Sequence, residues 1–515
     1  MKPGATFIAA LTATVGLMAS PAAAQDPVKG GDLVVAMAVT LPTVDPHAST
    51  GVATRYISAH IFESIVTRSE AGAIIPQLAA SYDMSDDATT YTFTLREGVN
   101  FHDGSTLDAG DVVASWERMK EKGVDQGVMA LVQNFEEVDD LTVKVTMTEP
   151  HPTFLDSLSS PRVIVGIMPE EVAGLPKEEF KAVGTGPFQF AEWVPDSHIK
   201  LTRFEDYSQQ EDAAPRDGFG GKRTAHVDSV TFRTVPEAGA QIAGLLTGDY
   251  HIADQVSPQD VPRLEASAEV NAVKVLPWYM VHQTFNLTKP IGADENFRKA
   301  VQIGLNLEVL LDFATGGNYV LGHGWQYDGF PYHSDAGKET YNVADVDRAK
   351  ELLAQSSYNG EEIEILTISD EAALRDYAIA LADQMSKIGI KTRINAQNAA
   401  TWSALRVERE TWTIIIGGFG MAPAIGPFGM LRHFSGDGSL QGVKFPEIED
   451  AVHRVRTGLT FEERKQAFEE YQAAVLGHAI SIRAGAAGIY IGVRDEVKNF
   501  QPGRVIRAWD IWLDN

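Results

Sequence analysis

The sequence predicts an α/β protein of two or three domains, and three features support this prediction. A chain of 515 residues is too long for one hydrophobic core. Residues 362–395 have the pattern of a strand, a helix and a second strand, which requires a parallel or mixed sheet covered by helices. Strands that alternate apolar and polar residues occur earlier in the chain, and a hydrophobic fraction of 44% excludes wholesale disorder.

Residues 1–24 are predicted to be a signal peptide. Lys2 provides a positively charged n-region, and residues 7–19 form a short apolar h-region. Ala22–Ala24 is a small-residue cleavage site before Gln25. The run is shorter than the about 20 apolar residues that span a bilayer. Because no Cys follows the cleavage site to carry a lipid, we expect a soluble, exported, periplasmic protein.

Four segments of the first part are predicted to be regular elements. Residues 32–39 form an apolar, buried strand before a loop with two prolines. Residues 91–95 and 141–147 alternate like half-buried antiparallel strands. Residues 108–122 form a helix, whose apolar face is made by Val112, Val113, Trp116 and Met119.

In the strand–helix–strand unit, the first strand ends at Ile368 and Ser369 with Asp370 supplies helix N-cap chemistry. Gly389 ends the helix, and the second strand starts at Ile390.

Residues 412–416 then form a buried strand that opens into a glycine-rich loop, residues 417–420. Ligands of open α/β sheets bind at the carboxyl ends of strands. The loops after Ile368 and Ile416 are therefore the predicted positions of a ligand site.

Composition excludes several classes of function. Lys and Arg number 43 against 70 Asp and Glu, a net charge of −27 that argues against partners such as nucleic acid or anionic lipid. The absence of Cys excludes disulfides and thiolate chemistry. No nucleotide-binding or hydrolase motif occurs, and the 13 histidines lack ligand spacing, so we expect no cofactor, no protein-held metal and no enzyme activity. His102–Asp103–Gly104 is more typical of a turn than of an acid–base pair.

Candidate ligand-binding residues are aromatic side chains beside the predicted strand ends and one arginine. Aromatic rings give a cleft a large contact area at low entropic cost, although each ring could instead belong to a core. Arg483 interrupts the apolar run 479–486 and needs an acidic partner, either an internal Asp or Glu or a group on the ligand. The aromatic candidates are Trp278, Tyr279, Trp325, Trp402 and Phe419, the last beside Gly418.

Short motifs along nearly the whole chain resemble those of the family 5 extracellular solute-binding proteins, the peptide/opine/nickel group of ABC importers. The most specific is the stretch 85–104, with Tyr91–Leu95 followed by Arg96-Glu97-Gly98-Val99. The others, in the same order as in the family, are 45–47, 61–65, 76–79, 184–188, 246–249, 286, 297–301 and 349–353.

This resemblance implies a two-lobe periplasmic binding protein fold of type II, with an extra domain inserted in the first lobe. The first lobe would comprise residues 25–66, 186–284 and 487–515, the extra domain 67–185, and the second lobe 285–486. A ligand that touches both lobes would favour a closed form, which would dock on an ABC permease with its ATPase subunits. We expect a monomer.

The family's loop at 418–423 carries, in peptide-binding members, an Asp that holds the peptide's amino terminus. Here that position is Ala422, whereas Trp402 and an arginine, Arg406 or Arg409, are retained. With Arg483, these residues favour peptide-like or carboxylate-bearing solutes.

Two alternatives remain open. One is a metal-chelate receptor of the nickel type that uses Arg162. The other is a periplasmic hydrolase that uses Asp103 with a histidine.

Overall fold

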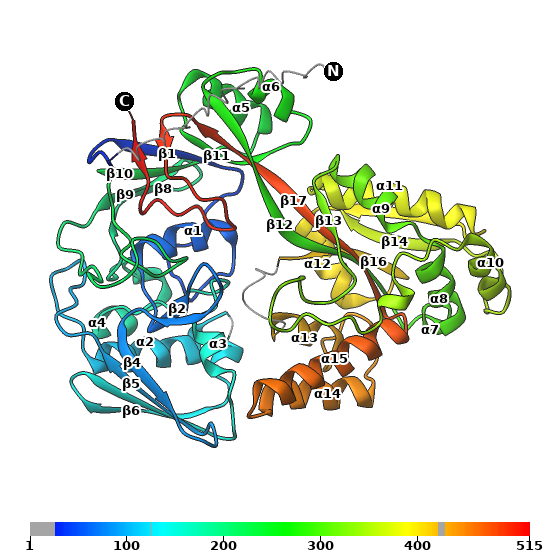
Figure 1. Cartoon of the computed structure of the whole chain (residues 1–515), viewed down its shortest axis with the longest axis horizontal. Coiled ribbons are helices and arrows are strands. Elements are labelled where there is room, and N and C mark those ends of the chain that lie inside the picture. The colour runs from blue at the N-terminus through cyan, green and yellow to red at the C-terminus, as the bar shows by residue number, and fades with distance from the viewer. Residues whose placement is uncertain (1–25, 125, 421–427, 515) are drawn as a thin grey trace, which may run out of the picture.

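The computed structural model describes residues 26–124, 126–420 and 428–514, which form two α/β lobes joined by two long strands (Figure 1). The predicted cleavage site before Gln25 and the position of Ala422 lie outside these residues. The joining strands are β12 (Val270–Phe285) and β17 (Ser481–Arg494). No helix in the described part of the chain combines the length and apolar character needed to cross a bilayer.

One eleven-stranded sheet runs through both lobes in the order β15-β14-β16-β12-β17-β11-β1-β10-β9-β8, with β13 also paired to β17. On the first-lobe side β1 is parallel to β10 and β11, and on the second-lobe side β14 is parallel to β15 and β16. The bounds of the first-lobe strands are β1 (Asp32–Met37), β8 (Phe188–Val194), β9 (His198–Arg203), β10 (Ser229–Thr234) and β11 (Ile252–Val256). Those of the second-lobe strands are β13 (Tyr319–Leu321), β14 (Ile363–Ile368), β15 (Thr392–Gln397) and β16 (Ile414–Phe419).

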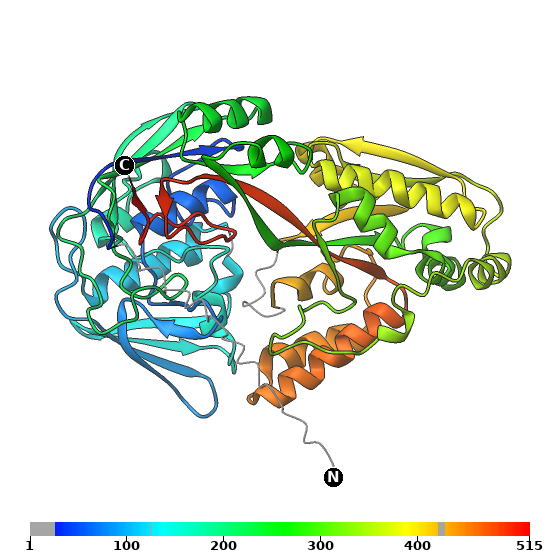
Figure 2. The same cartoon turned by 45° about the horizontal axis from the view of Figure 1, so that its top comes forward.

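The strands β12 and β17 are the only part of this sheet shared by both lobes among the described residues, and they cross between the lobes in both views (Figures 1 and 2). They pair in antiparallel register from Val270 with Arg494 to Thr284 with Ser481. The register shifts between Val275 and Tyr279, which increases local twist where the strands leave the first lobe. A rotation of one lobe against the other must therefore be taken up by these two strands.

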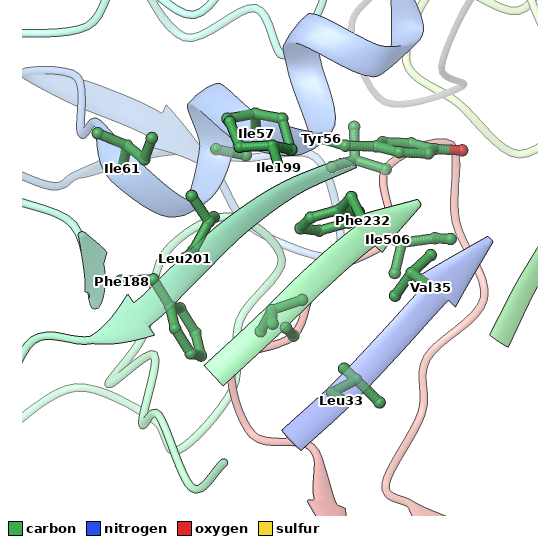
Figure 3. Close-up of a cluster of buried hydrophobic side chains, with 14 of the residues drawn as sticks. Leu33, Val35, Tyr56, Ile57, Ile61, Phe188, Ile199, Leu201, Phe232 and Ile506 are labelled. Carbon is green, nitrogen blue, oxygen red and sulfur yellow. The ribbon is translucent and has the colours of Figure 1, made fainter. Parts of the chain in front are cut away.

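The core of the first lobe lies between its sheet and α1 (Val52–Ile61). Figure 3 shows Tyr56, Ile57 and Ile61 of this helix directed at the apolar side chains of β1, β9 and β10. The C-terminal segment completes this core through Ile506 and Trp509. The other elements of this side are α5 (Ala238–Thr247), α6 (Val261–Glu265), β18 (Val497–Lys498) and β19 (Trp512–Leu513).

A second, antiparallel sheet with its own core lies between α1 and β8 in chain order. Its strand order is β4-β5-β7-β6, and α2 covers it, with Trp116 of the helix packed edge-on against Phe93 at 5.5 Å. A reciprocal capping box between Asp108 and Asp111 begins α2. The elements of this part are β2 (Val66–Arg68), β3 (Ile74–Pro76), β4 (Ala79–Met84), β5 (Thr90–Leu95), α2 (Ala109–Lys122), β6 (Val132–Asp139), β7 (Thr142–Met147), α3 (Phe154–Leu158) and α4 (Glu170–Ala173).

In the second lobe, helices cover both faces of the β14–β16 sheet. The helices α14 and α15 pack together and form the lower edge of the lobe in Figure 1. The bounds of these helices are α7 (Pro290–Ala293), α8 (Glu295–Gly304), α9 (Leu307–Thr315), α10 (Val346–Ala354), α11 (Ala372–Lys387), α12 (Ala399–Glu408), α13 (Phe428–Phe434), α14 (Pro446–Thr457) and α15 (Phe461–Gly477).

Most predicted elements are confirmed, with two corrections. The strands at 32–39, 91–95 and 141–147, the helix at 108–122 and the parallel strand–helix–strand unit are present, although Val113 is only half-buried. The N-cap prediction was wrong: α11 starts after Glu371, and Asp370 instead accepts a hydrogen bond from the backbone N–H of Ala399 at 3.0 Å.

The second correction concerns the glycine-rich segment after Ile416. It is not a loop at first, because β16 continues through Gly417 and Gly418 to Phe419, paired with β12. Two of the predicted domain limits, after residues 284 and 486, fall inside the shared strands β12 and β17.

Candidate functional site

A cavity of about 1060 Å³ lies between the lobes. Its first-lobe wall is built by the segment before β6, the segment after β7, and α3 with the residues that follow it. Its second-lobe wall is built by the end of β16, α12, α13 and α14. Figure 1 shows α3 facing α13 and α14 across the gap. A ligand in this cavity would touch both lobes.

A stack of aromatic rings forms part of the second-lobe wall of the cavity. Phe419 lies parallel to His282 with ring centroids 3.9 Å apart, and its ring lies 4.2 Å from that of His433. Trp325 packs edge-on against Phe419 at 5.9 Å from the core side. The stack therefore fixes the ring of Phe419 where it borders the cavity.

The glycines of β16 make this stack possible. A Cβ on Gly417 would lie 2.8 Å from Nε2 of His282, and one on Gly418 would lie 2.8 Å from the ring of Tyr279. Any larger residue would push these cross-strand side chains away. Two glycines thus allow large rings on β12 to lie against the backbone of β16.

Positive charge gathers on the cavity walls. Of the described residues that line the cavity, four are arginines: Arg162 from the first lobe, and Arg406, Arg432 and Arg456 from the second. The guanidinium of Arg406 lies 5.5 Å from the ring of Trp402. Burial, with the charges of Arg432 and Arg409, lowers the pKa of Arg406. The Arg162 guanidinium reaches the opposite wall, with Nη1 3.9 Å from the place of a Cβ on Gly429.

The carboxylates of the walls offset this charge only in part. They are Glu149, Asp156 and Glu449. Asp156 forms an ion pair with Arg68 at 2.7 Å, and Glu449 accepts a hydrogen bond from the backbone N–H of Gly436 at 2.8 Å. A protein with a net charge of −27 therefore has a cavity in which arginines outnumber carboxylates.

Two histidines of the second-lobe wall, His282 and His433, are held neutral. Burial, helped by Arg406, lowers the pKa of His282 to about 3. Burial and the nearby Arg432 also lower the pKa of His433 well below its usual value. Nδ1 of His282 lies 2.9 Å from Oγ1 of Thr284, so a chain of hydrogen bonds fixes the ring. These rings act as apolar and hydrogen-bonding surface, and not as cations, near pH 7.

Comparison with known proteins identifies the class. The profile of the bacterial extracellular solute-binding proteins, family 5 middle region, matches residues 73–441. The chain belongs to this family.

Its relatives in family 5 bind different solutes. Over 403 residues, the chain is 27% identical to the glutathione-binding protein GsiB of Salmonella paratyphi A, covering 77% of this chain and 75% of the relative. Two solved structures have the same fold. One is AgaA of A. tumefaciens R10 in complex with agropinic acid, with a TM-score of 0.76, 22% identity and coverage of 94% and 99% of the two chains. The other is NikA of Brucella suis in complex with Fe(III)-EDTA, with a TM-score of 0.82, 17% identity and coverage of 94% and 100%.

The family 5 fold is the two-lobe periplasmic binding protein fold that the sequence motifs indicated. The chain is therefore the solute-binding protein of an ABC importer and not an enzyme.

Four of the nine predicted site residues line the cavity of this family 5 protein, namely Trp402, Arg406, Gly418 and Phe419. The indole Nε1 of Trp402 is buried without a hydrogen-bond partner among the described residues. Trp402 and Arg406 lie on α12, which begins directly after β15, a strand end other than the two after Ile368 and Ile416 that were predicted.

The structure places two other predicted residues elsewhere. Arg409 ends α12 in a left-handed conformation, with φ of 56°, and its guanidinium donates to the carbonyl of Ser439. It therefore joins two loops and leaves Arg406 as the arginine of this helix that lines the cavity. Trp325 has no exposed surface and is a core residue behind Phe419.

Arg483 differs from both alternatives that the sequence left open. It is 2% exposed and does not line the cavity. Its guanidinium donates to the carbonyl of Gln326 at 3.2 Å and lies 5.1 Å from the ring of Tyr327, and its Nε has no partner within the described residues. Neither contact is a carboxylate.

Trp278 and Tyr279 lie on β12 at its register shift and outside the cavity lining. The guanidinium of Arg504 lies 4.7 Å from the ring of Trp278 and donates to the Trp278 carbonyl. These two aromatic residues therefore belong to the region where the lobes are joined.

The structure does not form an acid–base pair from His102 and Asp103. The backbone N–H of Gly184 donates to Nδ1 of His102, so Nε2 carries the proton and donates to the carbonyl of Gly186 at 2.9 Å. Asp103 accepts from the hydroxyl of Ser105 at 2.7 Å, as in a turn. Within the described residues, no group of three His, Cys, Asp or Glu side chains is arranged to hold a metal.

Sequence reasoning missed most of the cavity-lining charge. Arg432 and His433 lie on α13, and Arg456 lies on α14. These helices carry no motif. His433 of α13 packs against Phe419 at the end of β16, and α14 packs against α13, which brings both helices to the cavity. Arg162, considered only for a metal chelate, also lines the cavity.

Proposed function

We propose that this family 5 protein captures a carboxylate-bearing or peptide-like solute in the interlobe cavity and delivers it to its ABC permease. The observation that carries this proposal is the set of arginines on both walls of the cavity, in a protein that is otherwise strongly acidic. An interaction of guanidinium with carboxylate contributes about 1.5–3 kcal/mol. Because Arg162 and Arg406 come from different lobes, an acidic ligand between them favours the closed form.

The chemistry of the relatives' ligands supports the same class. Glutathione, agropinic acid and EDTA are all carboxylic acids, and these compounds are named with the three relatives. The aromatic surface of Trp402 and Phe419 suits the apolar part of such a solute.

The first test identifies the solute. Protein purified from the periplasm of its own host would be examined by native mass spectrometry, and glutathione would be the probe if no solute remains bound. We expect an added mass whose fragments include a carboxylate, or binding of glutathione measured by calorimetry. A bound solute without an acidic group would refute the proposal.

The second test uses matched arginines of one helix. Arg406→Met should weaken binding of that solute or probe about 10-fold or more, since 1.4 kcal/mol is a factor of ten. Arg409→Met removes an arginine three residues away that contacts Ser439 outside the cavity, so its affinity should stay within about twofold. Equal affinity of Arg406→Met and the wild type would remove Arg406 from the site.

A metal chelate is a second candidate, because Arg162 lines the cavity and no metal-binding cluster occurs in the described residues. A metal would then enter already held by an organic acid. Elemental analysis of the purified protein, before and after dialysis against a chelator, separates this candidate from a metal-free solute.

We further propose that the protein works in the periplasm as a monomer, without its first 24 residues. Osmotic shock should release it, and its amino-terminal residue should lie within about two positions of Gln25. Light scattering should give the mass of one chain. Recovery with membranes, or a retained Met1, would contradict the proposed export.

A further inference from the structure

Two further arginines stand beside the cavity, where the strands pass between the lobes. Arg504 belongs to the C-terminal segment of the first lobe and contacts Trp278 of β12. A Cβ on Gly420 would collide with its guanidinium, and Gly420 lines the cavity. Arg504 therefore lies at the hinge end of the cavity, next to the second-lobe wall.

Arg55, on α1 of the first lobe, lies near enough to Arg504 for the two charges to interact. Its guanidinium forms no ion pair or hydrogen bond with the described residues, and its Nε is buried. The Nε of Arg504 is likewise buried without a partner among those residues. Burial, with the positive charges of Arg504 and Arg162, lowers the pKa of Arg55 to about 10. The first-lobe face thus holds cations that repel one another.

Two carboxylates lie near this region: Glu371 acts on Arg504, and Asp254 acts on Tyr56, the neighbour of Arg55 on α1, but neither forms an ion pair with the two arginines among the described residues. Asp254 is fully buried and accepts a hydrogen bond from the backbone N–H of Ala38 at 2.9 Å. Burial raises its pKa to about 7, so it is partly protonated at neutral pH. Glu371 belongs to the second lobe, is exposed, and forms no ion pair with Arg504 within 4.0 Å in the part that the structure describes.

We propose that Arg55 and Arg504 form a second anion-binding point of the cleft, so that the captured solute carries at least two acidic groups. One acidic group of the solute would lie among Arg162, Arg406 and Arg432. The other would lie beside Arg504, at the end of the cavity where β12 and β17 join the lobes. This inference rests on the proposed function, which requires only one acidic group. Two partly buried cations that repel each other, and that pair with no carboxylate among the described residues, destabilise the empty protein. An anion that pairs with them favours the liganded closed state.

The experiment uses sulfate as an anion probe that can occupy each point separately. Melting temperatures of the mature protein would be measured in sodium sulfate and in sodium chloride at equal ionic strength. The general effect of sulfate on stability is common to all variants, so the difference between variants reports binding. We expect Arg55→Met and Arg504→Met each to raise the apparent sulfate dissociation constant at least fivefold. Arg348→Met, which removes an exposed arginine paired with Glu351 on α10, should equal the wild type.

Two more variants keep the proposal falsifiable. Arg504→Lys keeps the charge beside Trp278 and should restore part of the sulfate effect if Arg504→Met folds poorly. Glu371→Gln tests whether closure instead pairs Arg504 with Glu371. We expect this variant to bind sulfate at least as tightly as the wild type, and a loss equal to that of Arg504→Met would overturn the proposal.

The outcomes separate this inference from the proposed function. If Arg406→Met loses sulfate binding while Arg55→Met and Arg504→Met keep it, the second point is refuted and the carboxylate site stands. If all three variants keep it, both proposals fail. If Arg55→Met lowers the melting temperature in chloride by several degrees and leaves sulfate binding unchanged, Arg55 is structural and the inference is wrong.

Discussion

The buried ion pair between Glu63 and Arg223 allows a sharp prediction about the stability of the first lobe. Both side chains are 2% exposed, and Oε1 of Glu63 lies 2.9 Å from Nη1 of Arg223. Glu63 also accepts from the hydroxyls of Thr185 and Tyr207, each at 2.9 Å. The guanidinium lies 4.4 Å from the ring of Trp509 in the C-terminal segment. Glu63 follows α1 closely, so this network connects the end of that helix to Thr185 before β8 and to Tyr207 and Arg223 between β9 and β10.

Glu63→Gln removes the charge and keeps the shape. A glutamine oxygen can still accept from Arg223 and Tyr207, and its NH₂ can donate to Thr185, so the main loss is the charge that compensates a buried cation. Breaking a buried pair costs about 3–5 kcal/mol. We expect about 3 kcal/mol, the lower end, because the hydrogen bonds survive. With an unfolding entropy of about 2.1 cal/mol/K per residue, this is a fall in Tm of about 3–5 °C for a unit of roughly 300–500 residues.

Calorimetric melting and urea unfolding of the wild type and Glu63→Gln would measure this loss. Glu205→Gln is the control, because Glu205 pairs with Arg203 at 2.8 Å but is 68% exposed, and it should cost less than about 1 kcal/mol. A loss below 1 kcal/mol for Glu63→Gln, with an unchanged urea dependence, would show that the buried pair is not needed to compensate Arg223.

Three further predictions concern residues in and around the site. Arg483→Met should leave solute affinity within about twofold. It should lower the unfolding free energy by less than about 2 kcal/mol, because removal of a buried cation offsets the lost contacts. Calorimetry that finds a tenfold weaker affinity would place Arg483 in the site. Gly417→Ala should cost about 1–3 kcal/mol in urea unfolding and displace His282 from Phe419, whereas a neutral effect would mean that the stack adjusts freely. The pKa of His282 is lowered to about 3 in the fold and is 6.5 when unfolded, so its contribution is full above pH 6.5 and is lost as the pH falls toward 3. At pH 5 this loss is about 2 kcal/mol. His282→Asn should therefore reduce, by about that amount, the loss of unfolding free energy that urea unfolding measures between pH 7 and pH 5.

The fold was predictable where local patterns agree with the tertiary structure. The alternation at 91–95 and the apolar periodicity of α11 both report burial directly, so they indicate the element and its face. The end of β14 was less predictable, because Asp370 has the residue type of an N-cap but bonds to α12 instead of its own helix. The extension of β16 through Gly417 depends on cross-strand contacts with β12 that no local pattern contains.

Of the cavity-lining residues, the sequence indicated those near strand ends and those retained from the family's motifs. Phe419 is the last residue of β16 and Trp402 lies on the helix directly after β15, whereas Arg406 was named from the family resemblance. Arg432 and Arg456 come from helices whose sequence resembles any amphipathic helix, so only their packing distinguishes them. Arg483 shows the opposite error, since a cation in an apolar strand suggested an acidic partner and the structure supplies a carbonyl and an aromatic ring.

The shared strands also determine when the first lobe can fold. Its sheet needs β17, which pairs with β11, and its core needs Trp509, while the backbone N–H of Ala508 donates to His60 across 448 residues of sequence. A chain still being synthesised has an unpaired edge at β11 and an open groove beside α1. The first lobe therefore cannot complete its core until the last segment has been made, which keeps the chain unfolded for longer. Such a delay suits a protein expected to cross a membrane before it folds, and a truncated chain that ends before residue 481 should expose the groove to proteases.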